Sequence, residues 1–223
     1  MPLEELAQGA RSSGGIEAVI FDFGGVLSSP IAESFVHVQE AVGIAPEALG
    51  NAMATVTQRD GRNPLFALEC GEVTEREFMA DLGAVLSEQL GRVVEMQEFS
   101  AHYFRHLQTN HEMIGLTRSL RARGYRTAML TNNVREWEPR WRAMLPVDEL
   151  FELIVDSAFV GMRKPDPGIF LLTLERLGLP AEACLLIDDF AINCEGARAL
   201  GMHAVQFLDT AQTINDVEQT LLQ

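Results

Sequence analysis

Short apolar runs alternate with amphipathic helical patterns along most of this chain. The run EAVIFDF, which begins at Glu17, is apolar and rich in β-branched residues, as is typical of a strand buried on both faces of a parallel sheet. Four similar runs follow, at 125–130, 150–155, 183–187 and 202–208. Helical patterns separate the runs, at 112–123, 136–144, 167–177 and 192–200. The alternation predicts an α/β fold with a doubly wound, mainly parallel sheet.

A long insertion separates the first two predicted strands. The first strand ends at Asp22 and the second at Thr131, 109 residues later (131 − 22), which is far more than a crossover helix requires. The sequence T-E-R-E at 74–77 is typical of a capping box that starts a helix. Apolar residues in the insertion form two stripes at helical spacing, Ile31, Phe35, Val38 and Val42, then Phe78, Leu82, Val85 and Leu86.

These patterns divide the chain into three parts. We predict an N-terminal tail at 1–15, a core domain formed by 16–29 and 109–223, and a small helical cap domain at 30–108. The cap domain is inserted directly after the first strand. We therefore expect it to lie over the carboxyl ends of the strands, where open α/β sheets bind their ligands.

The charge of the chain argues against polyanionic partners. Its 32 acidic residues outnumber its 17 basic residues, which gives a formal net charge of −15. Such a chain repels nucleic acids and anionic membrane surfaces, so we expect neither as a partner. The apolar runs are too short to span a membrane and the N-terminus lacks a signal-peptide pattern, so we expect a cytoplasmic protein. The sequence specifies no oligomeric state.

The cysteines and the lysine of the chain are informative. The three cysteines form no C-x-x-C pair and are odd in number, so we expect buried, reduced thiols rather than a disulfide framework. Of the 17 basic residues only Lys164 is a lysine. This contrast suggests a position where a planar guanidinium cannot replace a compact ammonium group.

Polar residues gather at the expected ligand-binding edge of the sheet. They are Asp22 after the first strand, Thr131 in LTNN, Lys164 in GMRKPDP, and the pair Asp188 and Asp189 in LLIDDF. Adjacent carboxylates repel each other unless a cation lies nearby, or unless backbone N–H groups of the following helix satisfy them. Oxygen ligands next to a phosphate favour Mg²⁺ as that cation.

Together these residues suggest phosphoryl transfer. Asp22 would attack phosphorus and form an aspartyl phosphate, while Lys164 and Mg²⁺ neutralise charge. The Thr131 hydroxyl would hold phosphate oxygens. The expected partner is then a small phosphorylated metabolite, selected by cap residues that face the cleft.

Four segments resemble, in order and in spacing, the motifs of the haloacid dehalogenase-like superfamily: FDFGGVL, LTNN, GMRKPDPGIF and LLIDDFAINCEGARALGM. The resemblance covers nearly the whole chain from Glu17 and places the helical insertion where that family has its cap domain. Within the superfamily, the chain is most similar to the N-terminal phosphatase domain of soluble epoxide hydrolases and to small sugar-phosphate phosphatases.

The resemblance implies a Rossmann-like core, a Mg²⁺ cofactor and a role for each matching residue. It implies that Asp22 is the nucleophile and that Thr131 and Lys164 bind phosphate. The implied metal ligands are Asp22, Asp189 and the backbone carbonyl of Gly24. The remaining implied roles are support of the metal site by Asp188 and Asn193, and contact with the phosphoryl group or substrate by Asn132 and Gly25.

Gly24 departs from the family pattern. Typical phosphatases of the family have an aspartate there, which serves as general acid and general base. Such help is worth roughly 10²–10⁴-fold in rate. Glycine keeps the backbone carbonyl but lacks the proton shuttle, so leaving groups that depart readily as anions, such as a sugar hemiacetal or an acyl group, are favoured.

Three functions are compatible with these residues. The first is a Mg²⁺-dependent phosphatase of small metabolites such as sugar phosphates. The second is a weak or inactive protein of the same fold with a binding or regulatory role. The third is a 2-haloacid dehalogenase, which needs no metal, but the Asp188 and Asp189 pair is not expected beside a carboxylate substrate.

Overall fold

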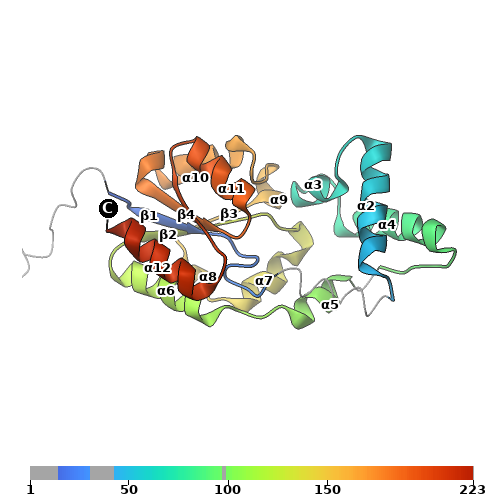
Figure 1. Ribbon diagram of the computed structural model, residues 1–223, viewed down its shortest axis with the longest axis horizontal. Helices are drawn as coiled ribbons and strands as arrows, with labels where there is room; N and C mark the ends of the chain where they lie inside the picture. The colour runs from blue at the N-terminus through green and yellow to red at the C-terminus, as the bar shows by residue number, and fades with distance from the viewer. Residues whose placement is uncertain (1–14, 31–42, 97–98, 223) are drawn as a thin grey trace, which may run out of the picture.

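A five-stranded parallel sheet forms the centre of the larger part of the molecule (Figure 1). The structure, a computed structural model, describes residues 15–30, 43–96 and 99–222. The strands are β1 (Ala18–Phe21), β2 (Arg126–Thr131), β3 (Leu153–Asp156), β4 (Cys184–Asp188) and β5 (His203–Gln206), in the order β3-β2-β1-β4-β5. All five predicted strands are therefore confirmed, and so is the α/β fold.

Helices cover both faces of this sheet, as the doubly wound prediction requires (Figure 1). Helices α6 (His111–Ala122) and α12 (Thr210–Leu221) lie on one face, and α10 (Pro167–Leu177) and α11 (Ala191–Ala199) lie on the other. Side chains of β1 alternate between the two: Val19 and Phe21 join one buried cluster, and Ala18 and Ile20 the other. A continuous apolar run thus becomes a strand buried on both faces.

Local boundaries differ from the predicted ones in three places. The third strand begins at Leu153 rather than at residue 150, because Val147–Leu150 forms the short helix α8. The predicted helix at 136–144 divides into the 3₁₀ helix η1 (Arg135–Trp137) and α7 (Glu138–Met144), which has a proline in its first turn. Proline has no N–H to continue a preceding helix. Helix α12 was not predicted.

The described part of the insertion contains four helices, which are α2 (Pro46–Asp60), α3 (Pro64–Glu69), α4 (Glu75–Leu90) and α5 (Phe99–His106). The predicted capping box at Thr74 and Glu77 is present at the start of α4. The predicted stripe from Phe78 to Leu86 is buried. The stripe at 31–42 lies outside the described residues, and the division into core and cap domains stays a prediction.

The insertion lies beyond one end of the sheet and docks on the short helix α9 (Ser157–Val160), which follows β3 (Figure 1). The Ser157 hydroxyl donates a hydrogen bond to the Glu69 carbonyl at 2.6 Å. Gly71 has a φ of +67°, and a Cβ there would lie 2.3 Å from the Ala158 carbonyl oxygen. Glycine is thus required where the two backbones touch.

Two further predictions concern the burial of the cysteines and the membrane-spanning segments. Cys70, Cys184 and Cys194 are buried and unpaired, as predicted. Over the ranges that the structure describes, no helix combines the length and the apolar character that a membrane crossing requires.

Candidate active site

Three carboxylates meet at the carboxyl ends of β1 and β4. Phe21 pairs with Ile187 in the parallel register, so the next residues along, Asp22 and Asp188, leave the sheet side by side. With Asp189, these two residues offer carboxylate oxygens that all lie within 4.8 Å of one another. Asp22 and Asp188 are buried, and Asp189 is partly buried. The sheet register alone brings together residues that are far apart in sequence.

Lys164 joins this cluster from the loop before α10. Its ammonium Nζ lies 2.9 Å from Asp22 Oδ1 and 2.6 Å from Asp188 Oδ2, and it also donates to the Leu130 carbonyl at 2.8 Å. The side chain is fully buried. Burial opposes the charge of the ammonium, but Asp188 and Asp22 together hold the pKa of Lys164 above its usual range.

Asn132 holds the backbone of Lys164 in place. Its amide oxygen accepts from the Lys164 N–H at 2.8 Å, and its amide nitrogen donates to the Lys164 carbonyl at 3.0 Å. The predicted contact of Asn132 with substrate stays a prediction. In this structure, both polar atoms of its side chain position the lysine.

Asp188 is more completely hydrogen-bonded than its neighbour Asp189. Its Oδ1 accepts from the Phe190 N–H and from the Asn193 amide, each at 2.9 Å, while its Oδ2 binds Lys164. By contrast, Asp189 Oδ1 is buried and has no hydrogen-bond partner among the residues that the structure describes. Asp188 is thus held by Asn193 and Lys164, whereas an Asp189 oxygen is left for another ligand. The predicted supporting role of Asp188 and Asn193 stays a prediction.

Asp22 and Asp189 resist ionisation when they have only Lys164 as a cation. Burial above all raises the pKa of Asp22 to about 8, because repulsion by Asp188 and Asp189 adds to it and Lys164 only partly offsets it. Burial, and next repulsion by Asp188, raises the pKa of Asp189 to about 6. A divalent cation beside these groups would favour their ionised forms.

The site has a suitable place for Mg²⁺. The donors are carboxylate oxygens, which Mg²⁺ prefers, and Asp189 contributes the buried oxygen without a partner. Gly25 keeps this place open, because a Cβ there would lie 2.5 Å from Asp189 Oδ2. Its φ of +77° also favours glycine. The neighbouring Gly24 is buried and lines the cavity described below.

Thr131 ends β2 beside this cluster and is also buried. Its hydroxyl makes only long contacts, at 3.5 Å to the Asn132 carbonyl and to the Asn133 amide nitrogen. Such distances are at the limit of a hydrogen bond. The hydroxyl is therefore only weakly held by the protein.

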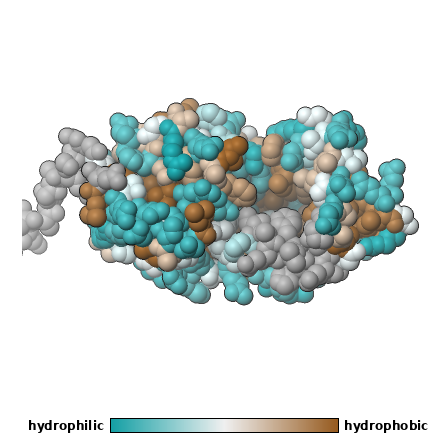
Figure 2. Space-filling view, viewed as in Figure 1, coloured by the Kyte–Doolittle hydropathy of each residue, from teal (hydrophilic) through white to brown (hydrophobic). Residues whose placement is uncertain are grey.

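A cavity of about 510 Å³ connects this cluster to the insertion. Its sheet wall consists of the lining residues at 22–24 and 132–193, and its insertion wall of the lining residues at 49–104. Figure 2 shows hydrophobic surface in the hollow between the two parts of the molecule. Asp22, Lys164 and Asn193 lie on the sheet wall, so the polar cluster opens into this cavity.

The ion pair between Glu69 and Arg163 crosses the cavity from one wall to the other. The Arg163 Nε lies 2.5 Å from Glu69 Oε2, and its guanidinium stacks over the Phe66 ring at 4.0 Å. Burial above all raises the pKa of Glu69 despite this partner. Sequence reasoning missed the pair, since its members are 94 residues apart and no motif joins them.

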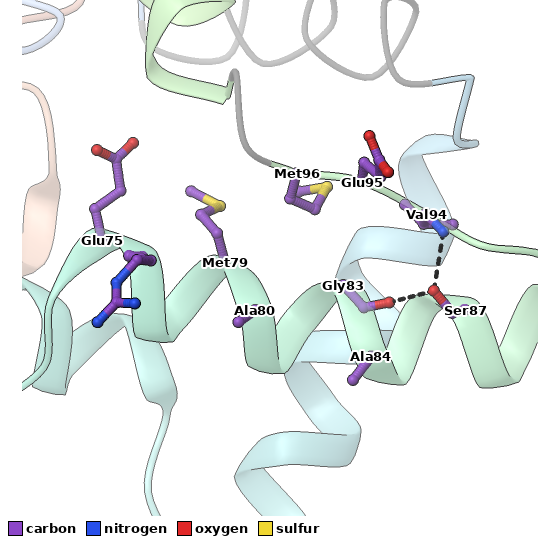
Figure 3. A pocket seen from close by; sticks show the side chains of 10 residues that line it. Glu75, Met79, Ala80, Gly83, Ala84, Ser87, Val94, Glu95 and Met96 are labelled. Carbon is purple, nitrogen blue, oxygen red and sulfur yellow. Dashed lines mark hydrogen bonds between the residues drawn. The ribbon is translucent and has the colours of Figure 1, made fainter.

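A larger hollow of about 710 Å³ lies along α4, between that helix and the segment 94–96 (Figure 3). The Ser87 hydroxyl donates to the Gly83 carbonyl and accepts from the Val94 N–H, which fastens the segment to the helix (Figure 3). None of its described lining residues belongs to the carboxylate cluster. We therefore place the chemistry in the smaller cavity.

Comparison with known proteins yields one family and several relatives. The family model described as haloacid dehalogenase-like hydrolase matches residues 16–201. Mouse acyl-CoA dehydrogenase family member 10 is 29% identical over 207 residues, which are 92% of this chain and 19% of the relative. Rat bifunctional epoxide hydrolase 2 is 24% identical over 220 residues, 92% of this chain and 38% of the relative. The chain thus spans well under half the length of both relatives.

Other relatives match over nearly their whole length. Phosphatase MT3486 of Mycobacterium tuberculosis is 28% identical over 211 residues, which are 92% of this chain and 94% of the relative. The structure of a predicted HAD-like family hydrolase from Porphyromonas gingivalis has a TM-score of 0.70 at 26% identity, covering 93% of this chain and 98% of that one. A HAD family enzyme of Bacteroides thetaiotaomicron, in complex with magnesium and inorganic phosphate, has a TM-score of 0.61 at 23% identity, covering 86% and 94%.

Proposed function

Because the chain belongs to the haloacid dehalogenase-like hydrolases, we propose that it is a Mg²⁺-dependent phosphatase that acts on small phosphorylated compounds. One observation carries the proposal: the single lysine is buried between two carboxylates, beside a third carboxylate with an unpartnered oxygen. The relative named as a phosphatase over its whole length, and the structural neighbour bound to magnesium and phosphate, support it.

Asp22 is the proposed nucleophile. Its Oδ1 accepts from the Phe23 N–H at 2.8 Å and contacts Lys164, whereas its Oδ2 accepts no hydrogen bond from the residues that the structure describes. Oδ2 would attack phosphorus, the ester P–O bond would break, and the alcohol oxygen would leave with the bonding electrons. Water would then attack the aspartyl phosphate, releasing inorganic phosphate and restoring the carboxylate.

The neighbouring groups would act on charge and orientation. The Lys164 ammonium would offset charge on the phosphoryl oxygens, and the weakly held Thr131 hydroxyl would donate to one of them. Asn132 and Gly25 would shape the phosphoryl site through Lys164 and Asp189. Mg²⁺, held by Asp22, Asp189 and the Gly24 carbonyl with Asp188 and Asn193 behind them, would supply positive charge to the phosphoryl group.

Gly24 limits the leaving groups that this site can expel. Glycine offers no carboxyl to protonate the departing oxygen, so that proton comes from water. Alcohols that are stable as anions therefore react faster, and we expect aryl and acyl phosphates to be better substrates than alkyl phosphates.

The test is phosphate release by the native chain and by the Asp22→Asn variant, with Mg²⁺ and with EDTA. Suitable substrates are p-nitrophenyl phosphate, acetyl phosphate and a sugar phosphate. We expect turnover that needs metal and that falls at least about 10³-fold in the variant, because the nucleophile is lost. Asp148→Asn makes the same exchange at a carboxylate that is 97% exposed, and it should leave the rate unchanged.

Two outcomes would contradict the proposal. Absence of phosphate release from every ester in the presence of Mg²⁺ favours a binding or regulatory protein. Halide release from chloroacetate without metal, abolished in Asp22→Asn, favours a dehalogenase.

A further inference from the structure

We propose that the group esterified to the phosphate is apolar and occupies the cavity between the two walls. The inference rests on the proposed function and narrows its substrates to phosphate esters of apolar alcohols or phenols. It departs from the sugar phosphates suggested by resemblance.

The composition of the insertion wall is the first argument. Helices α2 and α4 contribute Leu49, Met53, Phe78, Met79 and Leu82 to it, and none of these side chains is polar. Among the described residues of α3 and α5 that line the cavity, the polar side chains are Glu69 and Tyr103. A cavity of about 510 Å³ lies within the usual range for small-ligand sites.

The second argument is that the polar side chains of the insertion wall already contact other side chains of the protein. The Glu69 carboxylate binds Arg163 at 2.5 Å, and the Arg163 guanidinium carbon lies over the Phe66 ring, 4.0 Å from its centroid. The Tyr103 ring stacks on Trp137 with 4.9 Å between centroids, and both aromatic residues line the cavity. On the described part of the insertion wall, the hydroxyl groups of a sugar would find few partners, and each buried hydroxyl without a partner loses affinity.

The mouth of the cavity is the third argument. Phe190 and Ile192, one and three residues after Asp189, line the cavity and are 54% and 58% exposed. Large apolar side chains beside a cluster of carboxylates gain nothing from water. A substrate whose phosphate reaches Asp22 would cover them with its organic part. The polar cluster and the apolar walls thus match the two ends of one amphiphilic molecule.

A series of 4-alkylphenyl phosphates tests this inference directly. Members with side chains of one to six carbons share nearly the same leaving-group acidity, so they differ mainly in apolar length. Because a buried methylene is worth about 0.8 kcal/mol, we expect kcat/KM to rise about fourfold with each added carbon until the cavity is filled. A terminal hydroxyl on the same side chain should remove most of this gain.

A matched pair of variants locates the effect in the cavity. Met53→Gln places an amide on the insertion wall and should flatten the dependence on chain length. Met144→Gln makes the same exchange at a partly buried methionine of α7 that does not line the cavity, and it should keep the native dependence. Thermal unfolding of both variants shows whether the fold is retained, and the ratio between long and short substrates is unaffected by partial loss of folded protein.

The outcomes separate the inference from the function it rests on. Phosphate release without dependence on chain length, or with equal rates for the hydroxylated esters, overturns the inference and leaves the phosphatase in place. No release from any aryl phosphate overturns the proposed function and the inference with it. A length dependence that Met53→Gln and Met144→Gln alter equally also overturns the inference.

Discussion

The sheet wall of the cavity carries charged groups that are bound to one another, whereas the described residues of the insertion wall are almost all apolar. On the sheet wall, Lys164 and Asp22 line the cavity and form a buried network with Asp188, whose distances lie between 2.6 and 2.9 Å. On the insertion wall, the burial of the stripe at Phe78 and Leu82 continues up to the cavity surface. Under the proposed function, chemistry and substrate selection would reside on different segments of the chain, so each could be altered separately.

Removal of the buried ammonium should have the largest effect. Lys164→Met keeps most of the aliphatic stem but leaves three carboxylates without a cation from the protein. We expect kcat/KM to fall about 10³-fold, since a preorganised charge at the phosphoryl group is lost. The free energy of unfolding should fall by about 3–5 kcal/mol, because breaking a buried pair leaves uncompensated charge.

Phosphate release and denaturant unfolding measure these two effects. Arg118→Met removes an exposed cation that pairs with Glu149, and it should change neither by much. Retention of a tenth or more of the native rate in Lys164→Met would show that phosphate release does not depend on Lys164.

A substitution with a smaller expected effect, at Gly25, tests the proposed Mg²⁺ site. Gly25→Ala directs a Cβ at Asp189 Oδ2, so we expect the Mg²⁺ concentration for half-maximal activity to rise at least about tenfold. Gly161→Ala is the matched control, because Gly161 has a similar φ of +70° and nothing within 4 Å of the added Cβ. Both variants should lose about 1–2 kcal/mol of stability from the left-handed backbone. An equal Mg²⁺ requirement in the two variants would contradict the proposed site.

The last prediction concerns stability rather than activity, at Asp156, the residue before the helix α9 on which the insertion docks. Asp156 caps α9 by accepting from the Ala158 N–H at 3.0 Å, and its Oδ2 is buried without a partner in the described part of the chain. Burial above all raises its pKa to about 7. The unfolded state ionises near the ordinary value of 3.8, so this carboxyl costs stability as the pH rises from about 4 to about 7.

Asp156→Asn should therefore stabilise the fold at pH 8 relative to the native chain, by about 1–3 kcal/mol, and much less at pH 4. Unfolding by urea at the two pH values measures the difference. A stabilisation that is the same at both pH values would show that the ionisation of Asp156 is not its cause.

The sheet wall could be predicted from the sequence because its geometry follows from strand register. A residue directly after a parallel strand lies at the same edge as its counterparts, so Asp22, Thr131 and Asp188 could be placed together before any contact was known. The distances around Lys164 agree with that expectation. The hydrogen bonds of Asn132 to the Lys164 backbone were not foreseen, because they depend on how the loop folds.

The insertion wall could be predicted only in part. Helical spacing indicated that Phe78 and Leu82 face inward, but it cannot distinguish an apolar core from an apolar cavity, since both bury the same side chains. The link between Glu69 and Arg163 depends on how α3 docks against α9, which no local pattern encodes. The apolar cavity and the ion pair therefore depend on tertiary packing, which the motif residues alone do not specify.

Because Lys164 is buried, its chemical reactivity can also report how often the surrounding structure opens. With no other lysine in the sequence, the chain has no ε-amino group on its surface apart from what fluctuations expose. Amine-directed acylating reagents would reach this nitrogen only when the ammonium leaves Asp22 and Asp188 and loses its proton. The rate of acylation at this side chain, followed by mass spectrometry with and without bound phosphate, would therefore measure how often the cluster of Lys164, Asp22 and Asp188 comes apart.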